Sequence, residues 1–237
     1  MENEKFKKYI KEETIDFELL VEQHAGLSFE KQLRFGELIG DKAWELDMTE
    51  GTITFGEFVF PIQVIGSFSF QDNSWMCAWA NTKSGMPEKV LQQSYKLREL
   101  GEEEDIDALN SGHFSAAEEF VHQIGLFACG FFETKSYYCA NYGQGILVVT
   151  IDSDAIPAID KSKVEVVGTT FSQLISSIEL DHSNALFNYL IDRAFLINMT
   201  NNTIEGLKGD TIIKAEFDDW NRLTALNSSL FSQPSIK

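Results

Sequence analysis

The chain has few cysteines, and their arrangement argues against a structure held together by disulfides. Among 237 residues there are three cysteines, an odd number, and no Cys-x-x-Cys pair. Cys77, Cys129 and Cys139 each stand among apolar or aromatic neighbours, as small buried hydrophobic side chains do. We therefore expect free thiols rather than a disulfide framework.

Long hydrophobic runs are also missing. No apolar run approaches the ~18 residues that a membrane-spanning helix needs. The first residues, Met1 to Lys5, lack the apolar stretch behind a basic flank that marks a secretory signal. These absences predict a cytoplasmic protein that does not enter a membrane, in which the glycosylation sequons at Asn198 and Asn201 carry no meaning.

Basic side chains are scarce. The chain has 19 Lys and Arg against 37 Asp and Glu, which gives a formal net charge of −18. A surface of this sign repels the phosphates of nucleic acids and anionic membranes, so we expect neither as a partner. It favours a basic protein partner through electrostatic steering, although solubility alone also explains such a charge.

What the chain does have is enough apolar residues for a sizeable core. Hydrophobic residues make up 43% of it, including 19 Phe, which argues against global disorder. Apolar residues at helical spacing predict an N-terminal helix that ends at Gly26 and a second, short helix with Ser28 as its N-cap. The stripe of the first helix consists of Phe6, Tyr9, Ile10, Phe17, Leu20 and Val21.

From residue 44 onwards the apolar pattern alternates with a period of two, which is typical of strands. Two successive hairpins then predict a four-stranded antiparallel meander. Pro87 suits the first turn of a helix, and Ser115 is a good N-cap for another. The predicted elements are strands at 44–48, 52–55, 62–70 and 75–80, helices at 87–101 and 115–127, and strands at 137–142 and 146–152.

A polar stretch at 154–163 is the best candidate for a domain boundary. We expect one part at 1–155, with helices, the meander, a helix and a hairpin. A smaller helix–helix–hairpin part follows at 156–237, either as a unit of its own or as part of the same domain. The predicted fold class is α+β: an antiparallel sheet of hairpins with amphipathic helices packed on one face, arranged in one domain or in two similar halves. The later elements are helices at 171–178 and 183–194 and strands at 195–199, 211–217 and 223–226, the last two joined by the turn Asp218-Asp219-Trp220-Asn221.

One segment is distinctive: Ile65-Gly66-Ser67-Phe68-Ser69, followed by Ser74-Trp75-Met76-Cys77-Ala78-Trp79-Ala80-Asn81. It resembles the core of a widespread bacterial family, domain of unknown function 6882. That core reads Ile-Gly-Ser, a short turn, and a Trp-rich strand that ends in Ala-Trp-Ala-Asn. Trp44-x-x-Asp47, the turn at Gly51 and Gln63 also fit, so the resemblance covers roughly residues 41–101. Cys77 departs from it, because another aromatic residue is expected there. The resemblance implies a fold and an intracellular bacterial setting, and it implies no activity.

His113, Glu119 and His122 form the most enzyme-like group in the sequence. Glu119 and His122 are three residues apart on a predicted helix and so share a face. Di-iron carboxylate bundles use this spacing, but they need the motif twice, together with two further Glu residues. This chain has it once. Glu118 and His122 also suit a pair on a helix surface, so a solvated face explains the same residues.

Two other polar pairs have simple structural interpretations. Asp181-His182 precedes a predicted helix, where a short acidic residue caps the helix and meets its dipole. A catalytic Asp–His pair would need a nucleophile that the sequence does not place. Glu45 and Asp47 share one face of a strand. They could serve acid–base chemistry if another group completed the site, and a solvated outer face also explains them.

The strand that carries Trp75 and Trp79 is the most specific feature. One interpretation is a ligand-stacking platform on a concave sheet, with Gln63 and Asn81 as polar neighbours. The other is core packing against the helix that begins near Pro87. The sequence predicts no cofactor and no metal for this site, and it is silent on oligomeric state.

Three functions follow from these observations, in order of preference. The first is a non-catalytic intracellular binding protein that recognises a basic partner through an acidic surface, as an immunity protein does. The second is a small-molecule-binding protein that uses the aromatic face of the sheet, with Trp75, Trp79, Gln63 and Asn81. The third is a hydrolase or metal enzyme around His113, Glu119 and His122.

Overall fold

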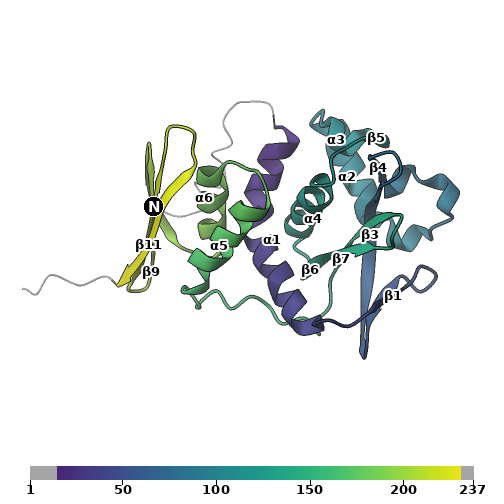
Figure 1. The fold of residues 1–237 in the computed structure, drawn as a ribbon, viewed down its shortest axis with the longest axis horizontal. Helices are drawn as coiled ribbons and strands as arrows, with labels where there is room; N and C mark the ends of the chain where they lie inside the picture. The colour runs from purple at the N-terminus through teal and green to yellow at the C-terminus, as the bar shows by residue number, and fades with distance from the viewer. Residues whose placement is uncertain (1–14, 231–237) are drawn as a thin grey trace, which may run out of the picture. The chain divides into compact units, whose positions relative to one another are not determined.

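The computed structural model describes residues 15–230, which form helices and antiparallel sheets (Figure 1). This confirms the α+β class. The predicted helical residues Phe6, Tyr9 and Ile10 lie outside the described residues. The described part divides into two compact units. The N-terminal unit consists of residues 15–21 and 28–158, and the C-terminal unit combines residues 22–27 with 159–230. Within the described residues no helix is both long and apolar enough to cross a membrane.

A seven-stranded antiparallel sheet forms the centre of the N-terminal unit. The first four strands follow one another in the order in which they occur in the chain, so the predicted meander is confirmed. The 12-residue strand β3 pairs with β2 through its first part, and with both β4 and β7 through its second part. The strands are β1 (Trp44–Asp47), β2 (Thr52–Phe55), β3 (Phe58–Ser69), β4 (Ser74–Cys77), β5 (His113–Ser115), β6 (Ser136–Asn141) and β7 (Gly145–Ile151).

Helices cover this sheet. Helix α4 packs on β6 and β7, whereas α2 packs on β3 and on the short helix α3. One core cluster combines rings from α1 and the first strands, such as Phe35, Phe55 and Phe60, with aliphatic residues of β3 and β7. The helices are α1 (Phe17–Ile39), α2 (Gln92–Glu103), α3 (Asp107–Asn110) and α4 (Phe120–Phe131), with short 3₁₀ helices at Ala78–Ala80, Thr82–Ser84 and Glu88–Val90.

The predicted break at Gly26 between an N-terminal helix and a second, short helix was wrong, because α1 runs through Gly26 without a break. Gly26 serves close packing within the C-terminal unit: a Cβ added there would lie 2.3 Å from the Cβ of Tyr189. Asp16 caps the helix by accepting a hydrogen bond from the Leu19 amide. Ser28, predicted as an N-cap, lies buried in the middle of the helix.

The predicted strand at 75–80 is also shorter than expected. Strand β4 ends at Cys77, and Trp79 belongs to a 3₁₀ turn, where its amide donates to the hydroxyl of Ser94. Trp75 and Trp79 therefore do not share one strand face. Ser115 ends strand β5, which pairs with β4, so the next helix begins only at Phe120.

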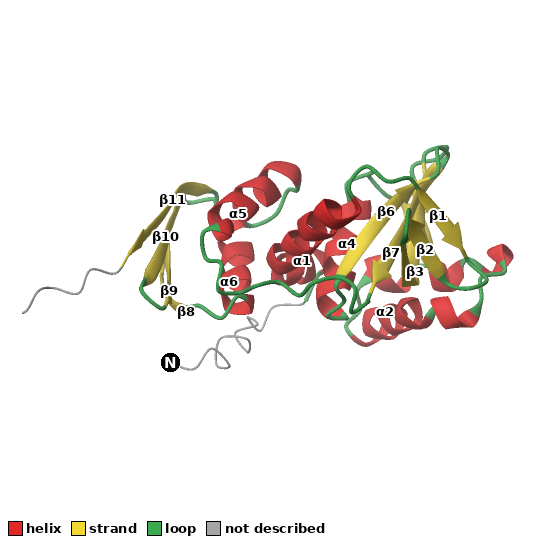
Figure 2. Ribbon diagram, turned by 90° about the horizontal axis from the view of Figure 1, so that it is seen from below, coloured by secondary structure: helices red, strands yellow, loops and turns green. Residues whose placement is uncertain are grey.

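The C-terminal unit is a four-stranded antiparallel meander with two helices on one face (Figure 2). Buried Ile, Ala and Phe side chains of the strands face the helices, including Ile204, Ile213 and Phe217. Strand β9 was not predicted. The elements are α5 (Val166–Ser177), α6 (His182–Asp192), β8 (Leu196–Thr200), β9 (Thr203–Lys208), β10 (Thr211–Phe217) and β11 (Leu223–Leu230).

Gly66 makes room for the Trp75 side chain. A Cβ at position 66 would lie 2.2 Å from Cζ2 of Trp75 and 2.6 Å from the carbonyl oxygen of Met76. Trp75 itself has 0% of its surface exposed, so the ring cannot move into solvent without opening the core. The Ile-Gly-Ser segment and the Trp-rich strand therefore pack directly against each other, with the Trp75 ring on the backbone of Gly66.

We expect Gly66→Ala to lower the free energy of unfolding by roughly 1–3 kcal/mol, the usual cost of overpacking a core. Gly36→Ala is the control. Gly36 lies in helix α1 with open space where a Cβ would be added, so the variant should gain about 0.5–1 kcal/mol through helix propensity. Urea unfolding followed by circular dichroism measures both. A Gly66→Ala variant as stable as the parent would contradict the packing described here.

Candidate functional site

Trp75 lies in the hydrophobic core rather than on a surface. Its indole Nε1 donates to the sulfur of Cys77 at 3.3 Å, and its ring meets Phe120 edge-on, with centroids 5.3 Å apart. Cys77 in turn donates to the carbonyl of Ser111. The Cys77 sulfur therefore accepts the hydrogen bond of the indole N–H through a lone pair. The ring of an aromatic hydrocarbon side chain at this position would offer no such lone pair.

Trp79 already has a cation on its ring. The guanidinium of Arg98 lies 4.6 Å from the ring centroid, and the same guanidinium donates to Glu102 at 2.7 Å. The arginine therefore makes a cation–π contact with the indole and pairs with a carboxylate at the same time.

Gln63 joins two distant segments through hydrogen bonds, whereas Asn81 makes a local one. Gln63 donates to the carbonyl of Lys89 at 2.8 Å and accepts from the amide of Gln93 at 3.2 Å, so it fixes the start of α2 against β3. The carbonyl of Asn81 accepts from the hydroxyl of Ser84. Their role in ligand binding stays a prediction.

The His113 imidazole, the Ser74 hydroxyl and the Asp72 carboxylate form a hydrogen-bonded chain with the serine in the middle. Its Nε2 lies 3.0 Å from the hydroxyl of Ser74, and that hydroxyl donates to Asp72 at 2.8 Å. Hydrogen bonds from Ser69 and Ser74 lower the pKa of Asp72. A nucleophilic serine needs a base that takes its proton. Here the buried Ser74 hydroxyl donates to the Asp72 carboxylate. This hydrogen bond suits a side chain that stabilises the turn between β3 and β4.

His122 lies on α4 beside the buried Tyr137 and the partly buried Cys139 of β6. Its Nδ1 is 3.3 Å from the hydroxyl of Tyr137 and 3.8 Å from the sulfur of Cys139. Burial lowers the pKa of His122, against the opposing effect of Glu118, and it raises the pKa of Cys139 to about 12. Both side chains are therefore neutral near pH 7, whereas a catalytic cysteine needs thiolate character.

The residues that the sequence grouped as a possible metal centre do not assemble. His113 lies on β5 and His122 on α4, while Glu119 is the N-cap residue of α4. Among residues 15–230 no group of three or more His, Cys, Asp or Glu side chains could hold a metal ion. The proximity of Cys139 to His122 was not predicted, because it depends on the packing of α4 against β6.

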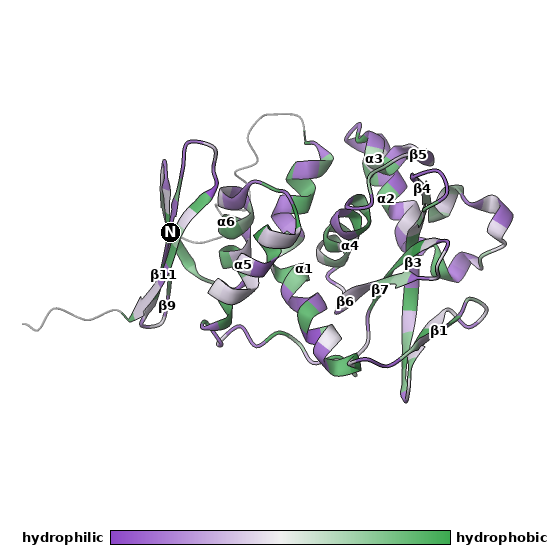
Figure 3. Ribbon diagram, in the orientation of Figure 1, coloured by the Kyte–Doolittle hydropathy of each residue, from purple (hydrophilic) through white to green (hydrophobic). Residues whose placement is uncertain are grey.

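Six exposed carboxylates lie between the second half of α2 and the start of α3, and we call them the acidic segment. Glu102 pairs with Arg98, and no ion pair involves the other five within the described residues. Figure 3 shows hydrophilic stretches on the ribbon at α2 and α3. The acidic segment consists of Glu99, Glu102, Glu103, Glu104, Asp105 and Asp107, all exposed.

In the C-terminal unit, Asp181 caps helix α6, as predicted from the sequence. One oxygen of its carboxylate accepts from the Asn184 amide at 2.8 Å, and the other accepts from the side chain of Asn221 at 2.5 Å. The neighbouring His182 accepts from the Leu223 amide through Nδ1 at 3.0 Å. Both residues thus tie the start of α6 to the β10–β11 turn.

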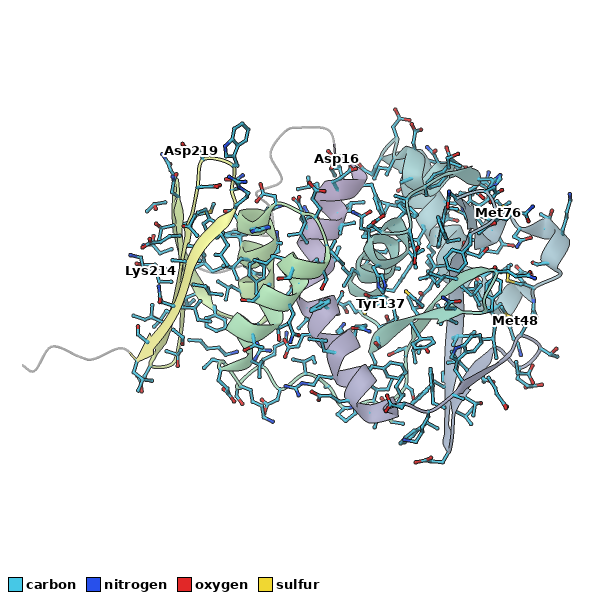
Figure 4. All side chains as sticks on the ribbon, viewed as in Figure 1. Asp16, Met48, Met76, Tyr137, Lys214 and Asp219 are labelled. Carbon is cyan, nitrogen blue, oxygen red and sulfur yellow. The ribbon has the colours of Figure 1, made fainter. Side chains whose placement is uncertain are left out.

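That turn presents Trp220 to solvent. The Trp220 side chain is 79% exposed, and its backbone amide donates to the carboxylate of Asp218 at 2.9 Å. Asp219, also exposed, lies at the same turn (Figure 4). The sequence predicted the turn correctly and did not single out its indole.

A groove of about 660 Å³ opens between α5 and strands β10 and β11. Its walls carry mainly hydroxyl and amide groups over the apolar floor residues Ile213 and Leu226, and Glu165 is its one ionisable residue. None of the residues predicted for ligand binding lines it. The lining comprises Val164, Glu165, Gly168, Thr169, Ser172, Gln173, Ser176, Ser177, Ile213, Leu226, Asn227 and Ser228.

Fold and surface together define an α+β protein with antiparallel sheets that presents carboxylates and an indole on hydrogen-bonded turns. A profile described as "Family of unknown function (DUF6882)" matches residues 18–154. That is more than half of the chain, so the protein belongs to this family, and the resemblance seen in the sequence is confirmed. Comparisons with the curated proteins and with the solved structures found no match.

The pH dependence of stability tests the bond between His182 and the Leu223 amide. Burial lowers the pKa of His182, while Asp181 and Asp218 oppose that shift. The unfolded chain therefore binds the proton more readily, and stability is lost as pH falls through about 6.5. His182→Asn keeps an acceptor but does not titrate, so the variant should lose less stability than the parent between about pH 7.5 and 5.

Urea unfolding at several pH values gives this comparison. The pKa of His122 is lowered as well, so His122→Asn serves as a second single variant that separates the two contributions. An unchanged pH slope in His182→Asn would show that burial does not keep this imidazole neutral in the folded chain.

Thiol reactivity tests whether Cys139 is a poised nucleophile. Burial raises the pKa of Cys139 to about 12 and that of Cys77 to about 11. We expect iodoacetamide to alkylate both in the folded chain roughly 100-fold or more slowly than in the urea-unfolded chain, because the thiolate is the reactive form. Peptide mass spectrometry follows each cysteine. Rapid alkylation of Cys139 in the folded chain would instead indicate an activated thiol beside His122.

Proposed function

We propose that this protein is a non-catalytic intracellular binding protein that recognises a basic partner protein through the acidic segment. An immunity protein that neutralises a basic toxin would work in this way. The observation that supports the proposal is the set of five carboxylates without an ion-pair partner in the described residues, gathered in nine positions of a chain with net charge −18.

The backbone holds the acidic segment rigidly. Helix α2 ends in a turn in which the amide of Ile106 donates to the carbonyl of Gly101 at 2.9 Å. Ile106 and Leu109 are buried behind it, and the side chain of Asn110 also donates to Gly101. A preordered acidic surface loses little conformational entropy when a partner binds, and its charge speeds the encounter.

Asp105 adds a second argument. Its φ is +56°, at the position after a helix end that glycine usually occupies because glycine has no Cβ to strain. A side chain at this position costs stability relative to glycine, although aspartate tolerates it better than most residues do. A carboxylate there is consistent with a surface selected for charge rather than for stability alone.

The candidate acid–base groups fit a binding role better than a catalytic one. The imidazole of His122 and the thiol of Cys139 are both kept neutral by burial, and Ser74 donates its hydrogen bond to Asp72. These arrangements supply neither a thiolate nor a serine activated by a base.

A pull-down at two salt concentrations tests the proposal. Basic proteins captured by the immobilised chain at about 50 mM salt should be lost at about 0.5 M, because salt screens exposed charges. The triple variant Glu99→Gln, Glu103→Gln, Glu104→Gln should bind the captured protein roughly tenfold more weakly.

The matched control carries Glu45→Gln, Glu50→Gln and Glu57→Gln. These three residues are also exposed and belong to the same unit, so the control changes net charge by the same amount. Equal losses in both triple variants would mean that net charge, and not the acidic segment, causes capture, and the proposed site would then be wrong.

A further inference from the structure

We infer that the exposed indole of Trp220 binds a cationic side chain of the basic partner, above all an arginine. The inference rests on the proposed function for the nature of the partner, but it concerns a different surface. Residues 155–237 lie outside the part of the chain that the family profile matches.

The exposure of Trp220 is the first observation. Its side chain is 79% exposed, whereas Trp75 has no exposed surface and Trp44 and Trp79 are half-buried. Tryptophan is large and mostly apolar, and it is among the residues most enriched at the centres of protein interfaces. In the described residues no ring or cation contact involves the Trp220 indole.

The turn that carries this indole is unusually well fixed. Asp218 accepts from the amides of Trp220 and Arg222, both at 2.9 Å. It also binds the Arg222 side chain, through Nε at 2.8 Å. The Asn221 amide donates back to the carbonyl of Asp218, and Asn221 adopts a positive φ of 58°. Asp218 thus organises the whole turn from one carboxylate.

The turn is also tied to the body of the C-terminal unit. Asn221 donates to Asp181 at the start of α6, and the Leu223 amide donates to His182. Glu22 of α1 accepts from the Asp181 amide at 2.9 Å and from the Asn184 side chain at 2.7 Å. A network across three elements therefore fixes the backbone of a residue whose ring is 79% exposed, and such preorganisation lowers the cost of binding.

The surrounding charge selects the occupant. Asp181, Asp218 and Asp219 lie at or beside the turn, and Arg222, the one cation in the turn itself, is paired with Asp218. An electron-rich indole next to carboxylates attracts a cation, and a planar guanidinium both stacks on the ring and pairs with a carboxylate.

The same chain contains this arrangement in completed form. In the N-terminal unit, the Arg98 guanidinium lies on the ring of Trp79 and binds Glu102. Trp220 and the adjacent Asp219 supply the indole and the carboxylate of such a site, and the partner would supply the arginine.

Nuclear magnetic resonance of the four indole N–H groups tests the inference on the full-length chain. The probe is a short arginine-rich peptide, and the control is the same peptide with citrulline in place of arginine, which keeps the shape and removes the charge. We expect the Trp220 signal to move in a saturable way with the arginine peptide alone. Trp220→Ala should weaken binding about fivefold or more, and Leu196→Ala, which also removes an exposed apolar side chain, should leave it unchanged.

The outcomes separate this inference from the proposed function. If the Glu99, Glu103, Glu104 triple variant loses the peptide and Trp220→Ala does not, the inference is overturned and the function stands. The reverse result supports the inference and removes the acidic segment as the site. Absence of any peptide binding counts against both. If acrylamide fails to quench Trp220 fluorescence in the free protein, a segment of the chain itself covers the ring, which also overturns the inference.

Discussion

The contact between the Trp75 ring and the backbone of Gly66 is the constraint on which the N-terminal unit depends. It sets the spacing between β3 and the side chains of β4, and it lets the indole reach the sulfur of Cys77 and the ring of Phe120 at once. The most recognisable motif of the sequence is therefore used for packing. The carboxylates and the indole that we propose for recognition lie outside this contact, on the α2–α3 turn of the N-terminal unit and on the β10–β11 turn of the C-terminal unit.

Much of the fold was predictable, because period-two and helical spacings directly reflect which side chains are buried. The pairing of β1 with β2, of β3 with β4 and of β6 with β7 follows that pattern. The capping role of Asp181 could also be predicted from the sequence, because the hydrogen bond joins residues only three positions apart.

Most of the missed features have a different cause, which is that long-range packing overrides local signals. Gly26 looks like a helix end but is required by the approach of Tyr189. Strand β5 is only three residues long, too short to show a period. Strand β9 contains Gly206, which lies against Leu190 and Phe195 and breaks the expected run of β-formers. The approach of Cys139 to His122, and the network behind Trp220, arise only from contacts between distant segments.

The exchange rate of the Trp75 indole N–H with solvent deuterium tests the central claim most directly, with Trp220 as a reference in the same molecule. If the ring is locked between Gly66, Cys77 and Phe120, its N–H should exchange as slowly as the most protected amides of β3, because only global unfolding would expose it. Exchange of the Trp75 N–H as fast as that of the solvent-exposed Trp220 would contradict the account, since it would place the motif's ring at an accessible surface rather than in the core.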